Sequence, residues 1–277
     1  MHIPDIEKFM TMDWAEIAPL YQALGSRQLG EDSVGEFLED WSALRKLVDE
    51  TYARLQLANA QDTTDQAAEA RYHAFLEDIY PPAETADQRL KEKFLKSGFF
   101  PGGMEVPLRK MRAEAALFCE ENLPLMTRER MLGSEYNKIL GSQTVTWEDE
   151  ELTLVNVRSR LRNPDRSYRE ELWRLLSERQ LEDREEINRL WVKLMVVRAE
   201  LAENAGKEDY RAFRWQQLPR LDYRPEDSRQ FLGAIKEVVV PAASRVYQRY
   251  QDRLGLDRLR PWDLLDNRTT FNLPALP

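Results

Sequence analysis

Few residues in this chain are of the types that carry out enzyme chemistry. Its 277 residues include two histidines, His2 and His73, and one cysteine, Cys119. Catalytic zinc is held by converging His, Cys and carboxylate side chains, with one coordination position left open. His73 has Glu69 four residues before it and Glu77 four residues after it, so the three would share one face of a helix. We interpret this spacing as a solvated polar face, and we predict no metal site in this chain.

Other catalytic motifs are missing from the sequence as well. It contains no His-Glu-x-x-His, no Gly-x-Ser-x-Gly elbow, no Gly-rich phosphate loop and no dinucleotide-binding fingerprint. Cys119 follows Leu117 and Phe118 on a predicted helix, which favours an inert, half-buried thiol over a nucleophile. Paired carboxylates are so frequent that no single pair indicates acid–base chemistry. We therefore predict no catalytic residue.

One group of arginines is a candidate for binding rather than catalysis. Arg211, Arg214 and Arg220 lie among aromatic residues in the last third of the chain. The aromatic residues themselves are typical of a helical core. A guanidinium group holds a carboxylate through two parallel hydrogen bonds. The hypothesis is that these three arginines anchor the carboxylate of a peptide.

Composition and charge exclude several classes of protein. Hydrophobic residues make up 42% and charged residues 32% of the chain, and the formal net charge is −9. An acidic chain of this kind does not favour nucleic acid as a partner. No apolar run approaches the roughly 18 residues of a membrane span, and the N-terminus does not resemble a signal peptide. With a single cysteine, these features predict a cytoplasmic protein.

The spacing of apolar residues predicts helices along most of the N-terminal half. Glycine and proline are sparse, 11 and 14 residues, and they cluster between periodic segments. Ser33 and Glu36 predict a capping box at the start of the first helix. Pro81 and Pro82 predict the end of the second. The expected helices cover residues 33–58, 64–80, 85–97, 107–121 and 127–140.

A small hairpin and two long helices are predicted after that. Alternating β-branched residues at 143–147 and an apolar return at 152–154 indicate a hairpin. Asn163 as N-cap and Pro164 as first residue open a helix predicted to reach Gly206, about 40 residues and ~60 Å long. Another helix covers about 226–253, with a kink at Pro241. The predicted fold is all-α, with two regions, 1–142 and 143–277.

The helix before Gly206 is apolar over much of its circumference. Leu190, Leu194, Val197 and Leu201 form one stripe, and Trp191, Val192 and Met195 extend around its side. Such a helix is normally buried on more than one face. We therefore expect an exposed apolar patch and self-association of this chain.

The order of motifs in the last third resembles a known family. Asn163-Pro-Asp-Arg166 opens the long helix, Asn204-Ala-Gly206 ends it, an aromatic stretch begins at Tyr210, and Arg260-Pro-Trp-Asp263 follows. This order and spacing resemble the oligoendopeptidase F branch of the thimet-oligopeptidase family, which are zinc metallopeptidases. The resemblance is clearest over residues 163–265.

The resemblance implies a bundle of long helices that forms one wall of a deep channel for short peptides. In the family, the zinc ligands, the general-base glutamate and the residues that orient the substrate lie further along the chain. None of these roles can be assigned to a residue here. We therefore expect a non-catalytic N-terminal part of a zinc-dependent oligopeptidase, inactive without its C-terminal catalytic half. The last residues, 269–277, show no capped element, which favours truncation. The alternative is a free-standing helical interaction protein.

Overall fold

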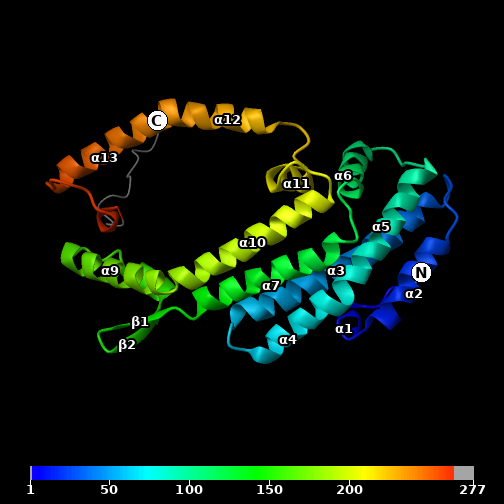
Figure 1. Ribbon diagram of the computed structural model, residues 1–277, viewed down its shortest axis with the longest axis horizontal. Helices are drawn as coiled ribbons and strands as arrows, with labels where there is room; N and C mark the ends of the chain where they lie inside the picture. Colours follow the sequence, from blue (N-terminus) through cyan, green and yellow to red (C-terminus); the bar gives the residue numbers. More distant parts are fainter. Residues whose placement is uncertain (1, 265–277) are drawn as a thin grey trace, which may run out of the picture. The chain divides into compact units, whose positions relative to one another are not determined.

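The helical periodicity of the sequence is confirmed in the computed structural model, which describes residues 2–264. The only sheet in that part of the chain is one two-stranded hairpin (Figure 1). The first half contains α1 (Ile6–Phe9), α2 (Trp14–Ser26), α3 (Val34–Gln61), α4 (Gln66–Ala74), a π-helical segment η1 (Phe75–Ile79), α5 (Tyr80–Ser97), α6 (Glu105–Ala115) and α7 (Asn122–Gly141). The second half contains β1 (Thr144–Trp147), β2 (Glu150–Thr153), α8 (Leu154–Arg160), α9 (Arg166–Glu182), α10 (Arg184–Asn204), α11 (Tyr210–Gln217), α12 (Pro225–Ala234), a second π-helical segment η2 (Ile235–Val239), α13 (Val240–Leu254) and the short 3₁₀ helix η3 (Pro261–Asp263).

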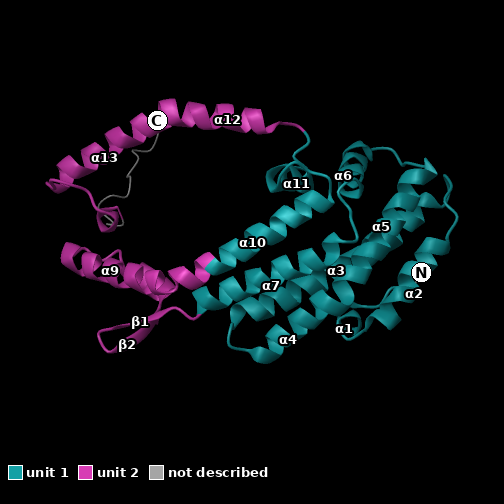
Figure 2. Ribbon diagram, viewed as in Figure 1, with its two compact units in different colours: residues 1–141, 189–221 teal, residues 142–188, 222–277 magenta. Residues whose placement is uncertain are grey.

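The chain forms two compact units, coloured separately in Figure 2. Unit 1 contains residues 1–141 and 189–221, and unit 2 contains residues 142–188 and 222–277. Most of α10 packs with the N-terminal helices, although it follows the hairpin in sequence. The sequence predicted two continuous regions, 1–142 and 143–277. In the structure, residues 189–221 belong to the first unit instead.

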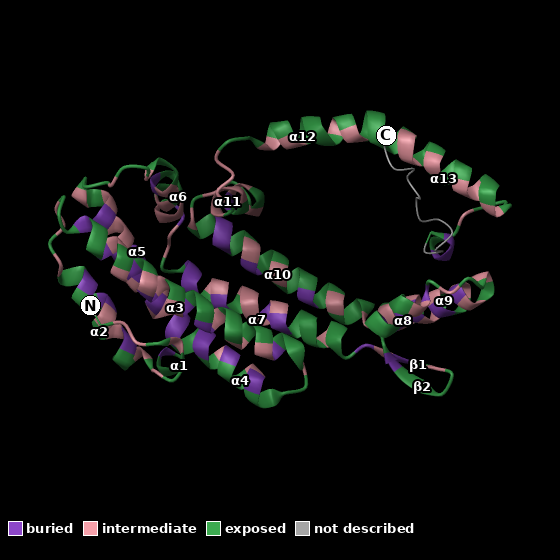
Figure 3. Cartoon of the chain, turned by 180° about the vertical axis from the view of Figure 1, so that it is seen from behind, coloured by how far each residue is buried: buried purple, intermediate pink, exposed green. Residues whose placement is uncertain are grey.

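Unit 1 is built around the apolar face of α3. Phe37, Trp41, Leu44 and Val48 are buried at the three- and four-residue steps that the sequence predicts. A second core lies around α10, where Val197 and Leu201 pack against residues of α7 and α11. Figure 3 shows the buried positions along these helices. Amphipathic periodicity therefore places the core of this unit correctly.

The predicted capping box at Ser33 is wrong. The Ser33 side chain makes no cap hydrogen bond with the first turn of α3. Its hydroxyl instead accepts a hydrogen bond from the Gly30 backbone N–H at 3.0 Å and donates to the Gln28 carbonyl at 3.1 Å. The Ser33 hydroxyl therefore binds the backbone of the preceding turn instead of the first turn of α3.

The predicted helix end at Pro81 and Pro82 is also wrong. The helix continues through both prolines, because η1 widens the turn immediately before them. In a π-helix the carbonyl of residue i accepts from residue i+5, so the Tyr80 N–H bonds to the Phe75 carbonyl. The prolines then lie in the first turn of α5, where a missing N–H is tolerated. The predicted end at Gly98 is confirmed, with φ of 76° at that glycine.

Unit 2 contains the hairpin and α9. Thr144 pairs with Thr153 and Trp147 with Glu150, so the predicted hairpin is confirmed. Its turn is two residues long, with φ of 53° and 62° at Glu148 and Asp149. Aspartate, as at Asp149, accepts this left-handed conformation better than most residues. The sheet and α9 share a small core that includes Val145, Leu152, Val157 and Leu172.

The single helix predicted from Asn163 to Gly206 is wrong, because it breaks at Asp183 into α9 and α10. The Asp183 carboxylate accepts hydrogen bonds from buried Gln143 and from Arg179, both at 2.7 Å. The N-cap is Asp165, not Asn163, and Pro164 precedes the helix. A contact with a residue 40 positions away in sequence stabilises the break, so local periodicity did not reveal it.

The last long helix is interrupted near Pro241, as predicted. The segment η2 separates α12 from α13, and Pro241 lies in the first turn of α13. Gly255 ends α13 with φ of 64°. None of the residues of α12, η2 and α13 is buried, and Figure 3 shows only exposed and intermediate positions along them.

Candidate functional site

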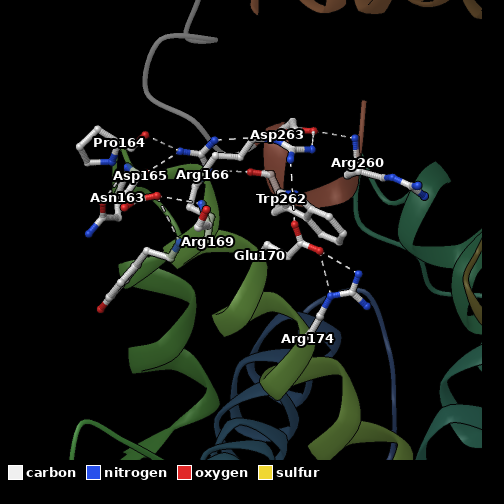
Figure 4. Close-up of polar contacts among 12 residues, drawn as sticks. Asn163, Pro164, Asp165, Arg166, Arg169, Glu170, Arg174, Arg260, Trp262 and Asp263 are labelled. Carbon is white, nitrogen blue, oxygen red and sulfur yellow. Dashed lines mark hydrogen bonds and ion pairs between the residues drawn. The ribbon is translucent and has the colours of Figure 1, made fainter. Parts of the chain in front are cut away.

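Two of the motifs that carry the family resemblance, at 163–166 and 260–263, meet in unit 2 as a cluster of polar contacts, drawn in Figure 4. Asp263, in η3, is fully buried. Arg166 donates two parallel hydrogen bonds to its carboxylate, from Nε at 2.8 Å and from Nη2 at 3.1 Å. The Arg260 backbone N–H donates to the same carboxylate at 2.8 Å. We call this arrangement the Asp263 clamp.

Arg169 completes the clamp from one turn further along α9. Its side chain is buried, with Nε donating to the Trp262 carbonyl at 2.8 Å. Its Nη1 donates to the carbonyls of Asn163 at 2.7 Å and Pro164 at 3.0 Å. A buried charge is costly without partners, and Arg169 finds its partners in two segments. These hydrogen bonds therefore hold the segment before α9 and the η3 turn together.

Trp262 adds an aromatic layer to the clamp. Its ring lies 5.3 Å from that of Trp173, and the Arg174 guanidinium lies 5.3 Å from its centroid. These contacts add two further residues of α9 to those that pack against η3. The motifs at 163–166 and 260–263 therefore contact each other and position these segments of the chain.

A larger cavity lies within unit 1, with a volume of about 770 Å³ and walls from α3, α5, α6, α7 and α11. The Trp41 indole N–H donates to Asp87 at 2.7 Å. Arg45 pairs with Glu84 at 2.8 Å, and Lys91 pairs with Glu114 at 3.0 Å. In sequence these charges are typical of solvated helix faces, and only tertiary packing shows that they line one cavity.

Arg130 and Tyr80 form a second polar group in the same cavity. The Arg130 guanidinium lies 4.0 Å from the Tyr80 ring centroid and 5.2 Å from that of Tyr52. Its Nη2 donates to the Tyr80 hydroxyl at 2.7 Å. Burial, with the negative charge of Glu84, raises the pKa of Tyr80 to about 12. The Tyr80 hydroxyl is therefore protonated at neutral pH.

The three arginines proposed from the sequence are each engaged separately. Arg211 lies 3.6 Å from the Asp209 carboxylate, Arg214 donates to Gln217, and Arg220 lies over the Trp215 ring at 4.8 Å. Their partners in these contacts are three different residues, so the contacts do not join one arginine to another. Their role in binding a peptide carboxylate stays a prediction.

The remaining candidate groups show no arrangement for chemistry. The Cys119 thiol donates to the Glu121 carboxylate at 2.7 Å, and this hydrogen bond raises the pKa of Cys119. A thiol with a raised pKa is a weaker nucleophile at neutral pH. Glu69, beside His73, pairs instead with Lys138 at 2.8 Å. The described residues contain no group of three or more His, Cys, Asp or Glu placed to hold a metal ion, so they do not fit a zinc site.

The apolar side of α10 is exposed where the sequence predicts a patch. Leu190, Val197 and Leu201 are buried, while Trp191, Val192, Met195 and Val196 are each more than half exposed. Part of this face borders a second hollow of about 650 Å³, next to Tyr210. The described helices include none that is long and apolar enough to cross a lipid bilayer.

Comparisons with known proteins agree with the arrangement of these elements. Residues 159–274 match the model of peptidase family M3. No curated protein matches the sequence of the chain. Among solved structures, an oligoendopeptidase F superimposes with a TM-score of 0.84 at 19% identity, over 96% of this chain and 46% of that chain.

Two further solved structures give the same result. PZ peptidase A, solved with an inhibitor, matches with a TM-score of 0.83 at 21% identity, over 96% of this chain and 47% of that one. A Bacillus anthracis protein assigned as an oligoendopeptidase F matches with a TM-score of 0.81 at 18% identity, over 95% and 48%. The chain thus spans about half the length of the structures it matches. The predicted resemblance to the oligoendopeptidases of peptidase family M3 is confirmed, in sequence over residues 159–274 and in fold over almost the whole chain.

Proposed function

We propose that this chain is the non-catalytic N-terminal part of a zinc-dependent oligopeptidase that hydrolyses short peptides. One observation carries the proposal: the fold matches 96% of this chain but only 46% of an oligoendopeptidase F, while residues 159–274 match the M3 family model. The partner of this part is a C-terminal half with the zinc-binding His-Glu-x-x-His helix. In this proposal the full-length enzyme, with both halves, acts in the cytoplasm.

In this proposal the residues of the chain shape and position, and they do not react. Zinc, held by the other half, would activate water for attack on the peptide bond. The described residues do not fit that metal, so no step is assigned to them. The Asp263 clamp holds the η3 turn against α9, and the exposed face of α10 supports docking of a partner surface or self-association. Arg211, Arg214 and Arg220 are proposed contacts for the peptide carboxylate.

The decisive experiment extends the chain. The coding sequence downstream of residue 277 is read, and the extended protein and the 277-residue chain are expressed side by side. Cleavage of an internally quenched peptide is measured with and without a chelator, together with zinc content after dialysis. We expect chelator-sensitive cleavage and one zinc per chain only in the extended protein.

The opposite results would reject the proposal. Zinc held one per chain by the 277-residue protein, or chelator-sensitive cleavage by it, would show that this chain carries its own active site. A downstream sequence without His-Glu-x-x-His, with a monodisperse monomer that binds no hydrophobic dye, would favour the free-standing interaction protein.

A further inference from the structure

The cavity of unit 1 has an excess of positive charge on its walls. Its lining includes the cations Arg45, Lys46, Lys91, Lys110 and Arg130, and the carboxylates Asp49, Glu84, Asp87 and Glu114, which is five against four. Each of these carboxylates lies within 4 Å of Arg45 or Lys91. Of the lining cations in the described chain, Lys46 and Arg130 have no carboxylate partner. An anion is therefore the charge that this cavity can accept.

Arg130 is the better placed of these two cations. Lys46 is exposed, whereas Arg130 is held over the rings of Tyr52 and Tyr80 by contacts that fix its guanidinium. Its buried Nη1 atom has no hydrogen-bond partner in the described residues. An unmet buried donor is unfavourable, and more so in a charged group, because burial removes the water that would otherwise accept its hydrogen bond. A ligand acceptor beside Arg130 would remove this cost.

Tyr80 supplies a second donor beside the first. Its hydroxyl oxygen accepts the hydrogen bond from Arg130 Nη2, which leaves its own hydrogen to donate. Two donors at one point match the two oxygens of a carboxylate. Leu38, Leu123 and Met126 line the same cavity and offer apolar surface for the rest of a ligand.

We propose that this cavity binds a small carboxylate with an apolar body, whose carboxylate accepts hydrogen bonds from Arg130 and Tyr80. The ligand chemistry occurs both in free organic acids and at the C-terminus of short peptides. The site lies within unit 1, apart from the Asp263 clamp in unit 2, and it requires neither zinc nor peptide cleavage. Its test is therefore independent of the proposed function.

The test is titration calorimetry on the 277-residue chain, with the change in tryptophan fluorescence as a second signal, since Trp41 is one of the seven tryptophans and lines the cavity. The probes are 3-phenylpropanoate and its uncharged amide, and N-acetyl-Leu-Phe with a free or an amidated C-terminus. Loss of a charge-assisted hydrogen bond of about 1.5–3 kcal/mol weakens binding roughly 10- to 100-fold, so we expect each amide to bind weaker than its acid by that factor. Tighter binding of the propanoate identifies a free acid, and tighter binding of the dipeptide identifies a peptide terminus.

Variants locate the binding in the cavity. Arg130→Gln should weaken the acids about 10-fold or more and leave the amides unchanged, with Arg130→Lys between the two. Tyr80→Phe should weaken the acids about 3- to 10-fold through loss of one neutral hydrogen bond. Arg128→Gln is the matched control, since Arg128 is an exposed arginine on the same helix and should bind as the unaltered chain does.

Three results would overturn the inference: no binding of either acid, equal binding of acid and amide, or unaltered binding by folded Arg130→Gln protein. Circular dichroism establishes that each variant folds. If Arg130→Gln does not fold, the acid–amide comparison and Tyr80→Phe decide the question, because neither disturbs the charge of Arg130.

Discussion

Two helices of this protein pass through prolines by the same local means but lie in opposite surroundings. In unit 1, η1 precedes Pro81 and Pro82, and in unit 2, η2 precedes Pro241. Both π segments are five residues long, and both end on a hydrogen bond to their first carbonyl. Yet Phe75, Leu76 and Ile79 are buried, whereas no residue of η2 is. The π-helical turn before each proline therefore forms from local sequence, whereas the burial of its side chains depends on the rest of the fold.

The difference is clearest at one carbonyl in each segment. The next π-helical bond would join the Leu76 carbonyl to Pro81, and the Lys236 carbonyl to Pro241, but proline has no N–H to donate. Leu76 is buried, and the Thr127 hydroxyl from α7 donates to its carbonyl at 2.9 Å. Lys236 is exposed, so water can donate a hydrogen bond to its carbonyl. The carbonyl that loses its N–H donor to proline is therefore met by another helix in the buried segment, and is open to water in the exposed segment.

The largest expected effect comes from the core side of this comparison. Leu76→Ala removes a fully buried side chain and should destabilise unit 1 by about 2–5 kcal/mol. Leu232→Ala is the same change just before η2, where Leu232 is 61% exposed, and should cost no more than about 0.5 kcal/mol. Urea unfolding followed by circular dichroism measures both. Equal losses would mean that the second helix is buried in solution.

The next effect tests what stabilises unit 2, where polar contacts at the Asp263 clamp accompany a small core. Asp263→Asn leaves the buried Arg169 without its nearby negative charge, 4.0 Å away, and should cost about 3 kcal/mol. Hydrogen exchange of residues 166–182 and 258–264 should accelerate, while exchange in α3 stays unchanged. The control Asp257→Asn alters an exposed aspartate in the same segment. Unchanged exchange in Asp263→Asn would show that the clamp adds no stability.

The smallest effect concerns the carbonyl itself. Thr127→Val keeps the shape of the side chain but removes the hydroxyl that serves the Leu76 carbonyl, and should cost about 1–3 kcal/mol. Thr127→Ser retains the hydroxyl and should lose less. The double variant with Leu76→Ala would show coupling, because the two residues are in contact. If valine and serine cost the same, the hydroxyl has no part in accommodating the prolines.

Arg130 shows why the candidate binding site could not be predicted from sequence. It stands in Thr127-Arg-Glu-Arg130, a run that is typical of a solvated helix face. Its partner Tyr80 lies 50 residues earlier, just before the prolines that we predicted would end the helix. Arg211, Arg214 and Arg220 are neighbours in sequence, yet each contacts a different residue in the structure.

Periodicity and short motifs by themselves determined the helical class, the hairpin near 143–154, the buried and exposed faces of α10, and the resemblance to oligoendopeptidases. The first three of these features depend on residues close together in the chain, and the resemblance depends on the order of short motifs along it. Tertiary structure decided one break and one continuation that the sequence did not predict: Gln143 binds the Asp183 carboxylate where α9 ends, and Thr127 donates to the Leu76 carbonyl, which Pro81 cannot do. It also decided which charges line a cavity and that the Arg166–Asp263 pair is structural, joining residues 97 positions apart. The physical reason is that a polar group must find a partner wherever packing buries it, and sequence distance does not tell which partner is near.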